Sequence, residues 1–297
     1  MSLTRRHFSK MLSSAIALSA TNFSVFAQAD KKPHDLLTQK LVALEKKLGG
    51  RLGAFILDTQ TGKHWAQREN ERFPMCSTFK LIACGAVLAK VDTGKEDLTR
   101  RIYFEKSDLV ANSPITEKHP GDEGMTLAEI CEAAITRSDN TAANIILKSL
   151  NGPSGVTAFA RILGDSVSQL DRFETELNEA TPGDIRDTTS PSSMAGNVNK
   201  LLLGNRLSIT SREQLKNWLV ANKTGDAKLR AGLPKEWIVG DKTGAGSYGT
   251  TNDIAIIWPA NRKPIIASIY ITEPKASFDD CNSAFAEIGR VTAGEIK

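Results

Sequence analysis

Cysteine and histidine are scarce in this sequence of 297 residues, which contains four of each. None of the cysteines belongs to a C-x-x-C or C-x-H pair. A structural zinc ion needs about four such ligands held close together, so this spacing argues against a metal site. We therefore predict that the protein works without a metal or another cofactor.

Long apolar runs are also missing from residue 30 onward. A membrane-spanning helix needs roughly 20 consecutive apolar residues, so we expect no stable membrane association. Separately, we expect the protein to be a monomer. The composition, 40% hydrophobic and 24% charged, is that of a globular protein large enough to bury a sizeable core. Three charges of the formal net +4 come from Arg5, Arg6 and Lys10. The nearly neutral remainder argues against a nucleic acid as partner.

The first 29 residues have the pattern of an export signal. A basic segment with Arg5 and Arg6 precedes a moderately apolar stretch, and small residues at Ala27 and Ala29 suit a signal peptidase. We predict a signal peptide over 1–29 and a periplasmic location after Gram-negative-type export. The paired arginines resemble a twin-arginine signal, and an ordinary Sec signal is the alternative. Export implies an oxidising compartment, in which cysteines can pair.

Strand-like segments lie towards both ends of the chain, and helix-like segments lie between them. Leucines recur on one helical face over 37–48, and Thr126 and Glu129 form a capping box that opens a helix within the mainly helical stretch 69–219. We predict strands at 52–59, 63–67, 237–242, 252–258 and 265–272, and a last helix at 278–291.

This order of elements predicts a fold of the α/β class, of α+β type, in which both chain ends build one domain. That domain would comprise 30–68 and 220–297, and an all-helical domain, 69–219, would be inserted into it. A cleft between the two is the default binding site.

Three short motifs carry the chemistry. Ser77 and Lys80 form an S-x-x-K pair in the segment MCSTFK, 138–140 read SDN, and 242–244 read KTG at the end of a predicted strand. Each motif alone is weak, because i and i+3 side chains face each other on any helix. In this order the three are the signature shared by class A β-lactamases and penicillin-binding proteins.

A fourth motif separates those two families. Glu174 to Asn178 read E-x-x-L-N, and Arg172 and Asp187 stand where an ion pair closes the loop 171–187. From about Leu36 to the C-terminus the chain therefore resembles a class A serine β-lactamase. The resemblance implies a five-stranded antiparallel sheet flanked by helices. It also implies hydrolysis of the β-lactam amide of penicillins and cephalosporins, and antibiotic resistance as the consequence.

The resemblance also assigns roles to individual residues. Ser77 would attack the lactam carbonyl, its proton passing to Lys80 or, through a water, to Glu174; this choice stays open. Ser138 would relay a proton to the lactam nitrogen, and Glu174 would activate the water that hydrolyses the acyl-enzyme. Lys242 completes the expected catalytic set. Residues expected to bind the substrate or the water are Asn140, Asn178, Lys228, Thr243, Gly244 and Ala245.

The sequence differs from the family pattern at the positions that bind the substrate carboxylate, and it matches part of the family at two cysteines. Thr251 and Cys281 stand at two positions where relatives use arginine for the substrate carboxylate, and Lys228 stands at the third. Cys84 and Cys131 match a disulfide found in part of the family, which we therefore predict.

Two other functions share parts of this signature. A D-alanyl-D-alanine peptidase would form the same acyl-enzyme, but the E-x-x-L-N loop argues against it. A penicillin-binding sensor would acylate and stop, but it would need a transmembrane segment. Preference among β-lactam classes depends on cleft differences worth about 1 to 3 kcal/mol, and the sequence leaves it open.

Overall fold

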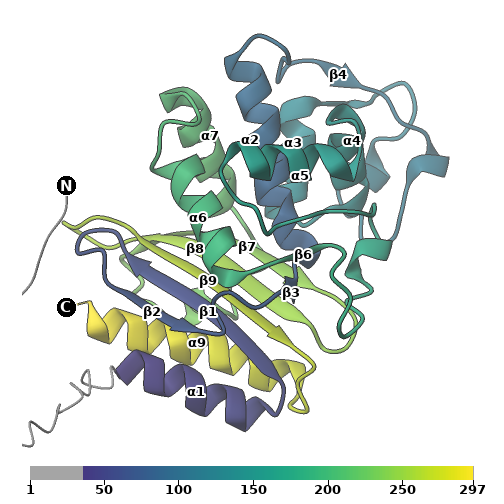
Figure 1. Ribbon diagram of the computed structural model, residues 1–297. Coiled ribbons are helices and arrows are strands. Elements are labelled where there is room, and N and C mark those ends of the chain that lie inside the picture. The colour runs from purple at the N-terminus through teal and green to yellow at the C-terminus, as the bar shows by residue number, and fades with distance from the viewer. Residues whose placement is uncertain (1–35, 297) are drawn as a thin grey trace, which may run out of the picture. The chain divides into compact units, whose positions relative to one another are not determined.

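One antiparallel sheet of five strands forms the centre of the computed structural model, which describes residues 36–296 (Figure 1). The strand order is β2-β1-β9-β8-β7, so the first two strands of the chain pair with the last three. The predicted five-stranded antiparallel sheet built from both chain ends is confirmed. Its strands are β1 (Arg51–Asp58), β2 (His64–Gln67), β7 (Ile238–Ala245), β8 (Thr251–Trp258) and β9 (Ile265–Thr272).

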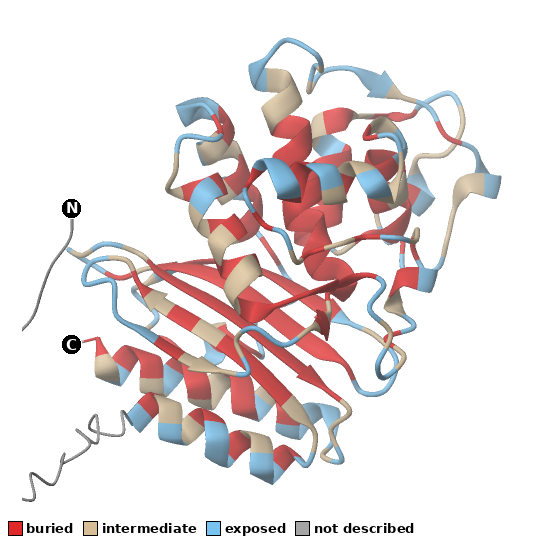
Figure 2. Cartoon of the chain, viewed as in Figure 1, coloured by how far each residue is buried: buried red, intermediate tan, exposed pale blue. Residues whose placement is uncertain are grey.

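Both faces of the sheet are covered, which explains the nearly unbroken burial of β8 and β9 (Figure 2). Side chains alternate between the faces of a strand. Accordingly Ile254 and Ile256 join one hydrophobic core, and Ala255 and Ile257 join another. The second core packs the sheet against α1 (Leu36–Leu48), the short α8 (Leu229–Gly232) and α9 (Phe278–Glu295).

The other face of the sheet packs against the helical stretch of the chain. Within it the predicted capping box is present, because the Thr126 hydroxyl accepts from Glu129 N and the Glu129 carboxylate accepts from Thr126 N. The division into domains at 68/69 and 219/220 stays a prediction. The helices are α2 (Phe79–Asp92), α3 (Leu127–Thr136), α4 (Asn140–Ser149), α5 (Pro153–Ile162), α6 (Pro191–Leu202) and α7 (Ile209–Val220). Short strands pair as β3 (Phe73–Pro74) with β6 (Thr188–Thr189) and as β4 (Arg101–Ile102) with β5 (Met125–Thr126).

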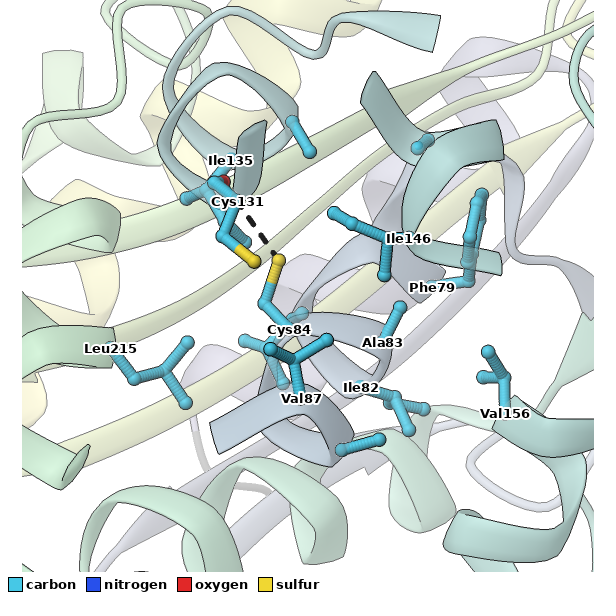
Figure 3. Close-up of a cluster of buried hydrophobic side chains, with 14 of the residues drawn as sticks. Phe79, Ile82, Ala83, Cys84, Val87, Cys131, Ile135, Ile146, Val156 and Leu215 are labelled. Atoms are coloured by element: carbon cyan, nitrogen blue, oxygen red, sulfur yellow. Dashed lines mark hydrogen bonds between the residues drawn. The ribbon is translucent and has the colours of Figure 1, made fainter. Parts of the chain in front are cut away.

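The predicted disulfide is wrong: Cys84 on α2 and Cys131 on α3 are both free, buried thiols. The Cys84 thiol donates to the Cys131 carbonyl oxygen at 3.8 Å, as the dashed line in Figure 3 shows. Hydrogen bonding with Cys84 and burial both raise the pKa of the Cys131 thiol. The two cysteines pack among aliphatic side chains as small hydrophobic residues.

The predicted signal peptide, 1–29, lies outside the described residues. Within 36–296, no helix is both long and apolar enough to cross a membrane.

Candidate active site

Ser77 lies in a single 3₁₀ turn, Cys76–Thr78, that leads directly into α2. Lys80, one helical turn later, donates from Nζ to Ser77 Oγ at 2.9 Å. Lys80 is fully buried, whereas a lysine that merely shares a helix face with a serine would extend into solvent. Burial of the Lys80 side chain therefore keeps its Nζ next to Ser77 Oγ.

The Lys80 ammonium is surrounded by acceptors. Besides Ser77 it donates to Asn140 Oδ1 at 2.7 Å and to the Ser138 carbonyl oxygen at 2.8 Å, and it forms an ion pair with Glu174 Oε1 at 2.9 Å. Both side chains of this ion pair are completely buried. Burying two charges is costly unless each is paired and hydrogen-bonded, and here both conditions hold.

Glu174 is fixed from three directions. Its backbone N–H and carbonyl are both bound by the side-chain amide of Asn144 on α4, at 2.8 and 2.9 Å. Asn178 donates from Nδ2 to Glu174 Oε2 at 2.5 Å, and Ser77 Oγ donates to Oε1 at 3.4 Å. One carboxylate thus contacts Ser77, Lys80 and Asn178.

The loop that carries Glu174 is closed by the ion pair expected from the sequence. Arg172 Nε lies 2.6 Å from Asp187 Oδ2, and Asp187 also accepts from the backbone N–H groups of Asp171 and Arg172. The peptide bond between Glu174 and Thr175 is cis.

The SDN segment faces the same site. Ser138 has φ 57°, in the left-handed region, and its Oγ accepts from Lys242 Nζ at 3.0 Å. Asp139 points away from the cleft; its carboxylate caps α4 at Ala142 N and holds the backbone of Thr116.

Lys242 is a second buried lysine at the site. Burial and the neighbouring Lys80 cation lower its pKa to about 7. Gly244, two residues on, lies against the segment before Ser77: a Cβ there would be 2.9 Å from the Met75 carbonyl oxygen. Glycine therefore allows β7 to approach the predicted nucleophile closely.

These side chains open onto a cleft of about 570 Å³. Lys80, Glu174 and Lys242 are buried behind its wall. The predicted site residues that line the cleft are Ser77, Ser138, Asn140, Asn178, Lys228, Thr243, Gly244 and Ala245.

Lys228 is held at one end of the cleft by polar and aromatic partners. Its Nζ donates to Thr251 Oγ1 at 2.5 Å and to Asn282 Oδ1 at 3.1 Å. It also lies 4.4 Å from the centroid of the Phe285 ring and 5.2 Å from that of Phe278. Burial lowers the pKa of Lys228, although the nearby Asp253 carboxyl opposes that shift.

Comparisons with known proteins agree with this arrangement. The model of the β-lactamase enzyme family matches residues 36–296. The chain is 46% identical to β-lactamase CTX-M-8 of Citrobacter amalonaticus over 95% of this chain and 94% of the relative. It is 52% identical to β-lactamase Toho-1 of Escherichia coli over 80% and 81% of the two chains. The solved structure of an ancestral class A β-lactamase superposes with a TM-score of 0.86 at 60% identity, covering 87% of this chain and 99% of that one.

The chain belongs to the class A serine β-lactamases. It is thus an enzyme that hydrolyses β-lactams. The S-x-x-K, SDN, E-x-x-L-N and KTG motifs, spread from residue 77 to residue 244, meet at one cleft of this β-lactamase. In residues 36–296, no three His, Cys, Asp or Glu side chains are grouped so that they could hold a metal ion.

Sequence reasoning overlooked two residues of this β-lactamase site. Asn144 holds the Glu174 backbone, and Asn282 on α9 accepts a hydrogen bond from Lys228. Asn144 stands alone as the amide in the apolar run that follows SDN. A lone amide in a buried helix needs a partner, and that signal could have revealed it.

Proposed function

We propose that this β-lactamase opens penicillins and cephalosporins through a covalent ester on Ser77, which water then hydrolyses. One observation carries the proposal: Ser77 Oγ lies 2.9 Å from Lys80 Nζ and 3.4 Å from Glu174 Oε1. A serine hydroxyl is a weak nucleophile and needs an adjacent base, and Ser77 has two candidates within contact distance.

In the acylation step, Ser77 Oγ bonds to the lactam carbonyl carbon and the lactam C–N bond breaks. The serine proton leaves to Lys80, once the Lys80 ammonium has passed its own proton to Glu174 across their ion pair, or to Glu174 through a water. Ser138 delivers a proton to the nitrogen, and it lies 3.0 Å from Lys242, which can restore that proton. The backbone N–H groups of Ser77 and Ala245 stabilise the oxyanion.

In the deacylation step, Glu174 takes the proton of the water that attacks the ester carbonyl. The bond between that carbon and Ser77 Oγ breaks, and Oγ regains a proton as the opened product leaves. Asn178 supports this role, because its Nδ2 holds Glu174 while its Oδ1 is buried without a hydrogen-bond partner among residues 36–296. A buried acceptor of that kind favours a donor such as water. Asn140 binds the side-chain amide of the substrate.

The substrate carboxylate binds at the end of the cleft formed by Lys228, Lys242 and Thr243. The cleft wall there holds the Lys228 ammonium between hydroxyl, amide and aromatic partners. A lysine is a point charge without the two-pronged geometry of arginine, so it anchors a carboxylate more loosely.

Replacing Lys228 with alanine is expected to raise KM for a penicillin more than it lowers kcat, since the lysine binds a group remote from the reacting bond. Steady-state kinetics measure both constants. Lys228→Arg should keep KM near the parent value, and Lys235→Ala serves as a control because Lys235 is an exposed lysine. An unchanged kcat/KM in Lys228→Ala would contradict the carboxylate role.

Export to the periplasm and a resistance role belong to the same proposal. Export is supported by the pattern of residues 1–29, with a twin-arginine or a Sec signal. We also propose that the enzyme acts as a monomer and without a cofactor.

The proposal is tested by the hydrolysis of one penicillin, one cephalosporin and one carbapenem by the purified protein. We expect loss of the lactam absorbance with at least the first two, and the three kcat/KM values define the substrate preference. Failure to open any of them would contradict the proposed function.

A further inference from the structure

Two aspartates are buried side by side behind the KTG strand. Asp241 on β7 and Asp253 on β8 are both completely inaccessible to solvent. In the β7–β8 register, Asp241 pairs with Ala255 and Asp253 pairs with Thr243. Paired residues share a face of the sheet, and so do residues two apart. Both carboxyl groups therefore lie on the face opposite Lys242, which points to Ser138.

Each aspartate has one partnered oxygen and one oxygen without a partner. Asp241 Oδ1 accepts from Arg230 Nε at 2.7 Å and lies 2.5 Å from Nη2 of the same ion pair, and Asp253 Oδ2 accepts from Leu229 N at 3.2 Å. Asp241 Oδ2 and Asp253 Oδ1 are buried and accept no hydrogen bond from any residue in 36–296. Two ionised carboxylates would leave both atoms unsatisfied and repelling each other, which is costly away from water.

The surroundings of the two carboxyl groups differ. Burial raises the pKa of Asp253 well above its usual range, and the neighbouring Asp241 adds to that rise. Burial also raises the pKa of Asp241, but the Arg230 guanidinium opposes the shift. Asp253 forms no such ion pair with any residue in 36–296, since Lys228 donates its hydrogen bonds to Thr251 and Asn282 instead. The nearby Lys228 cation opposes the rise in the pKa of Asp253 only from a distance.

We propose that Asp253 is protonated in the folded enzyme and donates a hydrogen bond to Asp241, so that the pair is a single anion that positions Lys242 and Thr243. This inference rests on the proposed function, in which these two residues bind the substrate carboxylate. Asp253 and Asp241 are positioning residues, because neither lines the cleft.

The pair is connected to the cleft through two elements of structure. Asp241 and Thr243 flank Lys242 on the same strand, so fixing the aspartate fixes the backbone from which the lysine extends. Thr224 Oγ1 donates its one proton to Asn222 Oδ1 at 2.9 Å, and it accepts from Thr243 Oγ1, which lies 2.6 Å away. Asn222 in turn lies near Asp241, where it opposes the rise in the pKa of that carboxyl group.

The shared proton also sets the charge of the cleft. One negative charge on the pair is matched by Arg230, which leaves Lys228 and Lys242 attractive to an anionic substrate. Two negative charges would compete with the substrate for both lysines. The remaining titratable groups that act on these lysines are Lys80 and Glu174 near Lys242, and Cys281 near Lys228.

Asp253→Asn is the deciding variant, since an amide is neutral and can donate to Asp241 as the protonated acid does. We expect kcat/KM within about twofold of the parent, because no hydrogen bond is lost, and an unchanged alkaline limb of the pH profile. If Asp253 is instead ionised, the substitution removes an anion that favours charged Lys242. The alkaline limb would then move to lower pH and KM would rise, and this result would overturn the proposal.

Asp253→Ala removes the donor and leaves Asp241 Oδ2 unpaired. We expect KM for a penicillin to rise about tenfold, the order of effect for a buried acceptor that loses its donor, with a smaller change in kcat. Equal kinetics for Asp253→Ala and the parent would show that the pair positions nothing at the cleft.

Difference infrared spectroscopy measures the shared proton without reference to activity. At neutral pH the parent should show the carbonyl band of a protonated carboxyl group, and Asp253→Asn should lack it. Absence of the band from the parent overturns the proposal even if Asp253→Ala does not fold. A band in a protein that opens no β-lactam would mean that the proposed function has failed while the acid pair stands.

Discussion

Replacing Glu174 with alanine is expected to give an enzyme that reacts once with penicillin and then nearly stops. An ester on Ser77 is stable unless a water is aimed at its carbonyl and deprotonated during attack, and general-base help of this kind contributes about 10² to 10⁴ in rate. Glu174 is the buried carboxylate beside Ser77 and Asn178. Stopped-flow measurement should therefore show a burst of one equivalent per enzyme followed by turnover slower by that factor.

The matched control is Glu176→Ala. Glu176 belongs to the same loop, two residues on, but it is exposed to solvent, so its removal should leave turnover close to the parent rate. Parent-like turnover in Glu174→Ala without a burst would contradict the assignment of Glu174.

Replacing Lys80 with alanine is expected to abolish the burst as well as turnover. The Lys80 ammonium contacts Ser77 Oγ, Asn140 and Glu174. Its loss removes a candidate base and leaves a buried carboxylate without its cation, which is strongly destabilising. Acylation should slow by about 10² to 10⁴, the range for general-base catalysis, as measured by single-turnover kinetics.

Lys90→Ala is the control for that variant, because Lys90 lies at the far end of the same helix and donates to the Ser149 carbonyl oxygen. If Lys80→Ala is acylated as fast as Lys90→Ala, then Lys80 has no role in acylation, which would contradict the prediction. Comparing the single-turnover acylation rates of Lys80→Ala and Glu174→Ala also identifies the acylation base: the variant that lacks it acylates more slowly.

The fold could be predicted because its strongest sequence patterns are local. The isoleucine-rich strands β8 and β9 are buried on both faces, and such runs stand out in any sequence. The Thr126 capping box specifies a helix start with four residues. The candidate site came from ordered motifs on those elements together with the family that these motifs resemble.

Features that depend on how elements pack could not be predicted in this way. Successive helical residues differ by about 100° in direction, so which residue at the start of α9 contacts Lys228 depends on how that helix packs, and it is Asn282. Whether Cys84 and Cys131 form a disulfide depends on how α2 lies against α3. The positions of two cysteines in the sequence do not specify the distance between their thiols. Asp253 sits within an apolar strand, and its environment comes entirely from neighbours distant in the sequence.

The central claim is that catalysis proceeds through an ester on Ser77, and the most direct test is peptide mapping of the Glu174→Ala variant after brief exposure to penicillin. The account predicts an added mass of one intact drug molecule per protein, located on the peptide that contains Ser77, and no addition in the double variant Ser77→Ala/Glu174→Ala. An adduct on another residue, or no adduct while the drug is being opened, would contradict it.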